Sequence, residues 1–311
     1  MGKEERCGIA ALRGARVRME EIAEQVGRHR STIYREVARN RARHDGKYRA
    51  GRAEEMTRAR RSRSRRNERI RQEEWKRVEE LLRQKWSPEQ ISGHLKSREK
   101  MKIGHERIYQ YVWADKDGGG SLHEHLRGAR KQRRKRYGRK DSRGRLAGKR
   151  PITERPASVE RRRRKGHWEI DTVLGGRGKD CILTMVERKT GYLLIGKLKA
   201  RTSEEAAKST LELINAHHGK MKTITADNGT EFHGYRQIEE QSSVKFYFAT
   251  PHHSWERGTN ENTNGLIRQY LPKRQSMAKL TQAQCDQIAL KINLRPRKRL
   301  NFKNPYECFF N

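Results

Sequence analysis

The chain has 311 residues, enough for two or three domains, and its 74 Lys and Arg residues against 38 Asp and Glu give a formal net charge of +36. A chain this basic favours a polyanion as its partner. No apolar run approaches the roughly 20 residues that span a bilayer, and none follows the first Met as in a signal peptide, so we expect a cytoplasmic protein with no membrane partner.

The positive charge lies mainly in the first half of the chain. Residues 1–165 carry 51 basic and 23 acidic side chains, whereas residues 166–311 carry 23 and 15. The cysteines are too scattered for a zinc site or a disulfide framework, so we interpret them as reduced thiols. These cysteines are Cys7, Cys181, Cys285 and Cys308.

Residues 1–45 are predicted to form a DNA-binding domain. Residues 19–40 contain two short helical patterns separated by Gly27, which is typical of a helix-turn-helix. Ser31 or Thr32 can cap the second helix. An ordinary helical hairpin is the alternative, but the arginines around the second helix favour DNA binding. The candidate DNA-contacting residues here are Arg28, Arg30, Ser31, Thr32 and Arg35.

Two further segments follow this domain. Residues 46–72 are rich in Arg and poor in apolar residues, which predicts a basic linker or a solvated helix. Residues 73–126 predict a second helical domain, in which Ser87 before Pro88 marks a helix start. This domain resembles another helix-turn-helix, and a packing or dimerising bundle is nearly as good an interpretation. Its expected core tryptophans are Trp75, Trp86 and Trp113.

Residues 127–165 are dominated by Arg, Lys and Gly, and predict a second basic linker that is disordered until DNA binds. After Gly166 the chain changes to alternating apolar segments typical of strands, with a helical pattern over 203–217. Three sequential strands and then strands alternating with helices predict a mixed sheet covered by helices, the order of a ribonuclease-H-like α/β fold over 166–311. The expected strands are 167–174, 181–187, 192–198, 222–227 and 244–249.

Three carboxylates stand out in this last region. Strand alternation directs Asp171 away from the face that carries Trp168 and Ile170. Asp227 ends a strand, and Glu261 lies near the start of a helix, with 33 residues between the two. Any single Asp or Glu is more often a surface charge than a ligand, and Glu169 and Glu231 are further candidates of this kind.

Three carboxylates in such positions suit metal-ion chemistry on phosphates. Two divalent cations about 3.5–4 Å apart need hard oxygen ligands and can stabilise both sides of an in-line phosphoryl displacement. We therefore expect two Mg²⁺ ions, with Mn²⁺ as a substitute and no small-molecule cofactor. Arg268 follows Glu261 by about two helical turns, so it can project from the same face and hold a phosphate.

Three motifs resemble the bacterial transposases of the insertion-sequence-thirty family, within the Asp-Asp-Glu recombinases. They are HWEIDTVLG, TADNGTEF and RGTNENTNGLIRQYLPK. The resemblance runs over most of the chain. It implies an integrase-like catalytic core in which Asp171, Asp227 and Glu261 hold the metal ions and Arg268 is the basic residue that follows.

The resemblance also implies a reaction sequence and partners. Water cleaves at the terminal inverted repeats of the element, and the freed 3′-hydroxyl attacks target DNA without a covalent protein intermediate. The implied partners are double-stranded DNA and further copies of the chain, in a protein associated with the nucleoid. Unlike retroviral integrases, the sequence has no His and Cys pairs spaced for an N-terminal zinc domain.

Several alternatives remain open from the sequence. A nuclease on the same fold would cut without joining, and a transposase-derived regulator would bind DNA without catalysis. His252, His253 and Trp255 precede Glu261 and either contact DNA near the cut or form a plain loop. Asn262 and Asn264 are interpreted as caps or solvent-facing residues, so we leave both out of the catalytic set.

Overall fold

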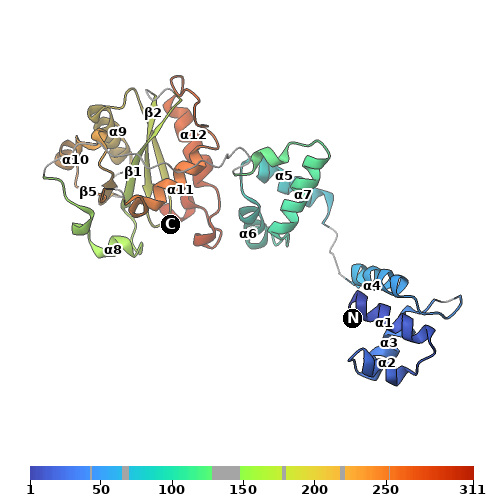
Figure 1. Cartoon of the computed structure of the whole chain (residues 1–311). Coiled ribbons are helices and arrows are strands. Elements are labelled where there is room, and N and C mark those ends of the chain that lie inside the picture. Colours follow the sequence, from blue (N-terminus) through green and yellow to red (C-terminus); the bar gives the residue numbers. More distant parts are fainter. Residues whose placement is uncertain (43, 65–69, 128–147, 177–179, 218–220, 252) are drawn as a thin grey trace. The chain divides into compact units, whose positions relative to one another are not determined.

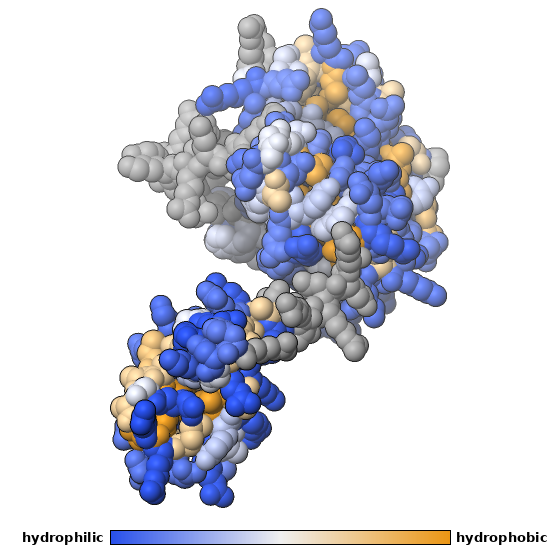
Figure 2. Space-filling view, turned by 90° about the vertical axis from the view of Figure 1, so that its right-hand side faces the viewer, coloured by the Kyte–Doolittle hydropathy of each residue, from blue (hydrophilic) through white to orange (hydrophobic). Residues whose placement is uncertain are grey.

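The computed structural model describes the whole chain except residues 43, 65–69, 128–147, 177–179, 218–220 and 252. The chain forms two compact units, Met1–Ile70 and Arg71–Asn311 (Figure 1). Figure 2 shows one face of the molecule, on which hydrophilic residues cover most of the surface and apolar residues reach it in small patches. No helix in the described parts of the chain is long and apolar enough to cross a membrane.

The first unit is a bundle of four short helices. The predicted helix pair is present, and Gly27 makes the turn between its helices with a φ of 63°, a conformation that favours glycine. Ile9, Ile22 and Ile33 are fully buried and pack in one core. The helices are α1 (Lys3–Gly14), α2 (Met19–Gln25), α3 (Arg30–Asn40) and α4 (Ala50–Ser64).

One prediction about this unit was wrong, and one alternative is decided by the structure. The cap of α3 is neither Ser31 nor Thr32 but His29, whose ring nitrogen accepts a hydrogen bond from the Ser31 N–H (3.3 Å). For 46–72, which the sequence predicts as a basic linker or a solvated helix, the structure shows the helix α4, and this helix packs against α1 and α3. Ala53 is fully buried, and Thr57 accepts a hydrogen bond from Arg6 (3.2 Å). α4 therefore docks through a few residues, and most of its described side chains stay exposed or half-buried.

The second unit begins with three helices, and the helix start predicted at Ser87 is confirmed. Ser87 caps its helix by accepting from the Gln90 N–H (3.3 Å). Trp86 is buried as expected, but Trp113 is 47% exposed, because Ile108 and Val112 form the buried face of that helix. The helices are α5 (Gln72–Arg83), α6 (Pro88–Arg98) and α7 (His105–Asp117), followed by the 3₁₀ turn η1 (Leu122–His125).

A five-stranded mixed sheet with the order β3-β2-β1-β4-β5 forms the centre of the second unit. The first three strands pair antiparallel, whereas β1 pairs parallel with β4 and β4 with β5. This topology confirms the predicted α/β fold, and each strand lies within a residue of its expected bounds. The strands are β1 (His167–Leu174), β2 (Cys181–Glu187), β3 (Leu193–Leu198), β4 (Thr223–Ala226) and β5 (Lys245–Phe248).

Helices cover both faces of the sheet (Figure 1). One core joins Trp168 and Ile170 of β1 to α9 and α10, and a second core joins Val173 of β1 to α11 and α12. Since both faces are covered, every residue from His167 to Ile170 is buried, including Glu169. The helices are α9 (Ser203–Ala216), α10 (Tyr235–Gln241), α11 (Gly258–Ile267) and α12 (Gln282–Asn293), and the remaining short turns are η3 (Thr230–Phe232) and η4 (Ser254–Arg257).

The second predicted linker, 127–165, is partly wrong. Its residues 128–147 lie outside the described residues, but 148–165 dock on the sheet through η2 (Ile152–Glu154) and α8 (Ala157–Glu160). The Phe248 N–H donates to the Arg150 carbonyl (2.9 Å), so this segment covers the edge strand β5. Val159 is fully buried. Main-chain pairing to a free strand edge and a few apolar anchors therefore order a segment that composition alone assigns to a linker.

Hydrogen bonds near the C-terminus hold α12 against the edge strand β3. Asn293 bonds the main chain of Leu193 in both directions, accepting from its N–H and donating to its carbonyl (2.8 Å each). Arg295 is buried and donates to Gln269 (2.7 Å) and to the Tyr270 hydroxyl (2.9 Å). The Asn293 to Arg295 motif thus serves the packing of the fold. The chain ends with η5 (Lys298–Leu300) and α13 (Pro305–Phe310).

The separate core of the first unit gives a stability prediction. Ile33→Ala should destabilise that unit by about 2–5 kcal/mol, because it leaves a cavity at a fully buried position. Hydrogen exchange measured by mass spectrometry should then accelerate across α1 to α4 and stay unchanged in β1 to β5. Thr32→Ala, at an exposed neighbour, should change stability by less than about 0.5 kcal/mol. Equal acceleration in both units would contradict the division of the chain.

Candidate active site

The pairing of two parallel strands determines where the first two carboxylates lie. β1 and β4 pair with His167 opposite Thr223 and Glu169 opposite Thr225. The same register places Asp171 level with Asp227, which directly follows the last residue of β4. Side chains at matching positions of neighbouring strands are close to each other. The fold therefore brings these two carboxylates together through main-chain hydrogen bonds.

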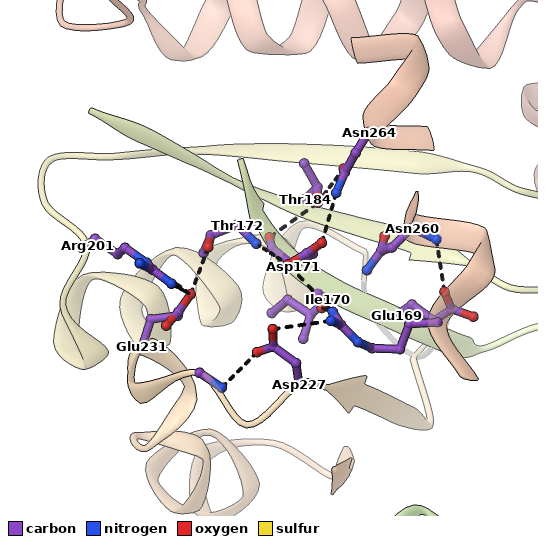
Figure 3. A network of polar contacts seen from close by, with 12 residues as sticks. Glu169, Ile170, Asp171, Thr172, Thr184, Arg201, Asp227, Glu231, Asn260 and Asn264 are labelled. Atoms are coloured by element: carbon purple, nitrogen blue, oxygen red, sulfur yellow. Dashed lines mark hydrogen bonds and ion pairs between the residues drawn. The ribbon is translucent and has the colours of Figure 1, made fainter. Parts of the chain in front are cut away.

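Asp171 is held by donors on both of its oxygens. The Thr172 N–H donates to Oδ1 (2.9 Å) and the Asn264 amide to Oδ2 (2.8 Å). Figure 3 shows Asn264 reaching down from α11 towards Asp171 and Thr184. Burial raises the pKa of Asp171, and the Asp227 carboxylate acts in the same direction, whereas Arg257 and Asn264 oppose the rise. A cation beside such a buried carboxyl group favours its ionised form.

Asp227 is fixed by a tight turn that requires glycine. Its Oδ1 accepts the Gly229 N–H (2.8 Å), and the amide of Asn228 donates to the Ala249 carbonyl (2.8 Å). A Cβ at Gly229 would lie 2.5 Å from the Glu231 carboxylate and 2.8 Å from that of Asp227. A side chain at this position would push the carboxylates out of place, so the Asp-Asn-Gly sequence is a geometric requirement of the site.

A cation already lies between the two aspartates. The Arg257 guanidinium approaches Asp227 Oδ2 at 3.2 Å and Asp171 Oδ1 at 3.5 Å, and it also donates to the Ile170 carbonyl (3.3 Å). The sequence interpretation missed this residue. The available signal was its position four residues before Glu261, directly before the helix that carries Glu261.

Glu261 occupies a different position from its two predicted partners. It is exposed on the first turn of α11 and makes no hydrogen bond or ion pair with any residue that the structure describes. Within the described ranges, no group of three or more His, Cys, Asp or Glu side chains is arranged to hold a metal ion. The structure therefore brings Asp171 and Asp227 together and leaves Glu261 outside. On the same helix Asn264, which we had left out, is the residue that contacts Asp171.

Buried charges connect the helix of Glu261 to the central strand. Glu169 is fully buried and accepts the main-chain N–H of Asn260 at the start of α11 (3.0 Å). It also pairs with Arg188 (3.4 Å), which in turn contacts Glu160 of α8 (3.1 Å). Burial lowers the pKa of Arg188, while Glu169 works in the opposite direction. The network fixes the N-terminus of α11 beside β1, so Glu169 is a structural residue.

A second buried carboxylate supports the other side of the site. Glu231 accepts hydrogen bonds from the Thr172 hydroxyl (2.8 Å) and from Arg201 (2.7 Å), as Figure 3 shows. Burial works against ionisation of Glu231, yet these hydrogen bonds lower its pKa overall. Glu231 is thereby committed to Arg201 and holds a guanidinium next to the strand that carries Asp171.

The candidate DNA-contacting residues lie in the first unit, apart from Arg268. Arg30, Thr32 and Arg35 are exposed on α3, and Ser31 is half-buried. Arg35 leans along its helix and donates to the Ser31 carbonyl (3.1 Å), whereas Arg28 is paired with Glu5 of α1 (2.9 Å). The first turns of α3 therefore present three exposed polar or basic side chains.

Arg268 faces the protein interior. It donates to the carbonyls of Leu174 at the end of β1 (2.8 Å) and of Leu271 (3.4 Å). Burial lowers its pKa. The helix α11 ends at Ile267, so Arg268 already belongs to the turn after it. In this structure the side chain holds the end of β1 against that turn.

Comparison with known proteins identifies relatives over almost the whole chain. A family model described as "Integrase core domain" matches residues 161–254. A transposase for insertion sequence element IS4351 of Bacteroides fragilis is 39% identical over 307 residues, which cover 99% of this chain and 94% of the relative. Transposase InsI for insertion sequence element IS30A of Escherichia coli (strain K12) is 38% identical, over 97% of this chain and 81% of that protein.

Among solved structures, the catalytic core domain of BIV integrase resembles part of the chain, with a TM-score of 0.38 and 19% sequence identity. The match covers 47% of this chain and 95% of that domain.

The Glu169 network makes a prediction that a double variant can test. Glu169→Gln should destabilise the protein by about 3 kcal/mol, because Arg188 loses a buried carboxylate partner, while Glu160 is largely exposed. Gln still accepts the Asn260 N–H, so the loss isolates the charge. Urea unfolding should show that adding Arg188→Met restores part of this stability, since the unpaired charge is then gone. Additive losses in the double variant would contradict the pairing.

Proposed function

Because the chain belongs to the insertion-sequence-thirty (IS30) family of transposases, we propose that its DNA cleavage and strand transfer take place at Asp171, Asp227 and Glu261. The chain is an enzyme that cuts and transfers DNA, as its relatives and its integrase core indicate. The observation that carries the assignment is the convergence of Asp171 and Asp227 on one cation, the Arg257 guanidinium.

The integrase core implies dependence on a divalent metal. The two aspartates fit such an ion, since both are hard oxygen donors and both already face a positive charge. We propose Mg²⁺, replaceable by Mn²⁺, with two ions per site. Bound ions of this kind activate an attacking water or 3′-hydroxyl and neutralise the charge on the leaving oxygen.

The residues of the chain prepare the site in distinct ways. Asn264 orients the Asp171 carboxylate, and the turn at Gly229 orients Asp227. Glu261 would complete the set by turning its side chain inward, and Arg257 would leave the aspartates because a bound cation and the guanidinium compete for the same two carboxylates. Arg257 is then available to a DNA phosphate, as guanidinium groups pair well with phosphate oxygens.

DNA binding is assigned to the basic surfaces of both units. The exposed residues of α3 suit a recognition helix, with Arg30, Thr32 and Arg35 nearest to the bases and Arg28 and Ser31 beside them. We assign these residues to the terminal inverted repeats of the element. Arg268 supports the active-site end of β1. Bridging two DNA ends requires more than one copy of the chain, and a charge of +36 favours association with the nucleoid.

The catalytic assignment is tested by strand transfer with the element's own ends. With Mg²⁺, the purified chain should nick a duplex carrying those ends and join the 3′-hydroxyl to a second duplex. Each of three variants should lower the yield of both products by more than about 100-fold: Asp171→Asn, Asp227→Asn and Glu261→Gln. Loss of a residue that only supports a metal ligand lowers activity by at most about 100-fold. Glu212→Gln, at an exposed position on α9, is the control. Full activity of Glu261→Gln would remove it from the site, and cleavage without joining would indicate a nuclease.

The position of Arg257 predicts how the site responds to metal. Without DNA, Arg257→Gln should bind Mn²⁺ at least about tenfold more tightly than the natural chain, since the ion no longer displaces a guanidinium from the aspartates. Isothermal titration calorimetry measures the affinity directly. Arg83→Gln removes the same charge from an exposed pair on α5 and should leave Mn²⁺ binding unchanged. Unchanged or weaker binding by Arg257→Gln would show that the guanidinium does not compete with metal.

A further inference from the structure

The turn η4, just before α11, carries an unusually exposed tryptophan. Trp255 is 69% exposed, more than any other large apolar side chain in the part of the chain that the structure describes. Isolated apolar residues on a surface need no special explanation. Trp255 differs because its ring stacks on a neighbouring ring and because it lies in the same turn as Arg257, which contacts both aspartates.

The ring of Trp255 is held by its neighbours. It stacks on His253, with ring centroids 4.3 Å apart and an interplanar angle of 25°. His253 approaches Glu256 (3.4 Å), whose carboxylate also accepts from the N–H (2.8 Å) and the hydroxyl (3.1 Å) of Thr250. The turn is thus closed by hydrogen bonds, and the ring loses little further freedom when it binds a ligand.

Trp255 lies in the same turn as Arg257, the residue that contacts both aspartates. Arg257, which spans Asp171 and Asp227, follows Trp255 by two residues, a length of at most about 7 Å along the chain. The two aspartate side chains are only 23% and 20% exposed. A phosphate that approaches these carboxylates also approaches Arg257, which lies in the same turn as Trp255.

We propose that Trp255, backed by His253, is a stacking platform for a nucleobase that leaves the duplex next to the phosphate being cut or joined. His253 covers one face of the indole, and the other face is available to a base. Stacking on an aromatic ring compensates the unstacked base and accepts all four bases. The base belongs either to the element's end or to the target DNA. This inference rests on the proposed function, because it requires DNA at the carboxylates.

The platform is tested by binding, with no need for cleavage. The full chain is titrated with a short hairpin duplex ending in a single unpaired adenine, and with the same duplex carrying an abasic residue there, in Ca²⁺ and without added metal. Trp255→Ala should weaken binding of the adenine probe by about 5- to 150-fold and leave the abasic probe unaffected. Trp255→Phe should keep most of the affinity. Leu290→Ala, at another exposed apolar residue on α12, should change neither.

A second measurement distinguishes the source of the base. The abasic residue is placed first in a duplex with the element's end and then in the target duplex. Trp255→Ala and the natural chain should bind with equal affinity only when the abasic residue replaces the base that stacks on Trp255. Equal weakening of adenine and abasic probes would overturn the proposal. So would a change of oligomeric state without an effect on DNA, which would show that Trp255 contacts a second copy. Because binding is measured, loss of catalysis alone leaves the outcome readable.

Discussion

The parallel pairing of β1 with β4 is the constraint on which the rest of the active site depends. It holds the carboxylates of Asp171 and Asp227 at the same level of the sheet, where they are partly buried and close to each other. Two negative charges in such a place repel strongly unless a cation or donor lies between them. Three groups reduce this repulsion. They are the guanidinium of Arg257, the side-chain amide of Asn264 and the main-chain N–H of Gly229.

The same constraint explains why so much of the surrounding structure is polar and buried. A helix that carries groups into the site must start beside β1, where its first N–H groups have no partner within the helix. Glu169 provides that partner for Asn260 and is itself neutralised by Arg188. On the other side Glu231 fixes Arg201. Buried ion pairs add little stability on their own, so their value here is in holding α11 and the strand ends in one arrangement.

Much of the fold follows from sequence patterns, because apolar periodicity and turn residues act locally. The five strands, the helix pair around Gly27 and the cap at Ser87 were all predictable in this way. Long-range packing was not. Trp113 is exposed because other residues of its helix form the buried face. Residues 148–165 pair with the free edge of β5, and no local sequence pattern reveals this pairing. The Asp171 and Asp227 pair was predictable because the first lies on a strand and the second directly follows one, whereas Arg257 is recognised only once its guanidinium is seen between them.

The difference between the aspartates and Glu261 reflects the elements that carry them. Asp171 lies within a strand and Asp227 in a turn closed by its own carboxylate, so neither moves without breaking main-chain hydrogen bonds. Glu261 lies on the first turn of a helix, where the side chain is exposed and free to adopt other rotamers. Arg257, directly before that helix, and Glu261 carry opposite charges. A divalent cation between the aspartates would repel the first and attract the second, so the proposed metal site would exchange an internal counter-ion for a third carboxylate.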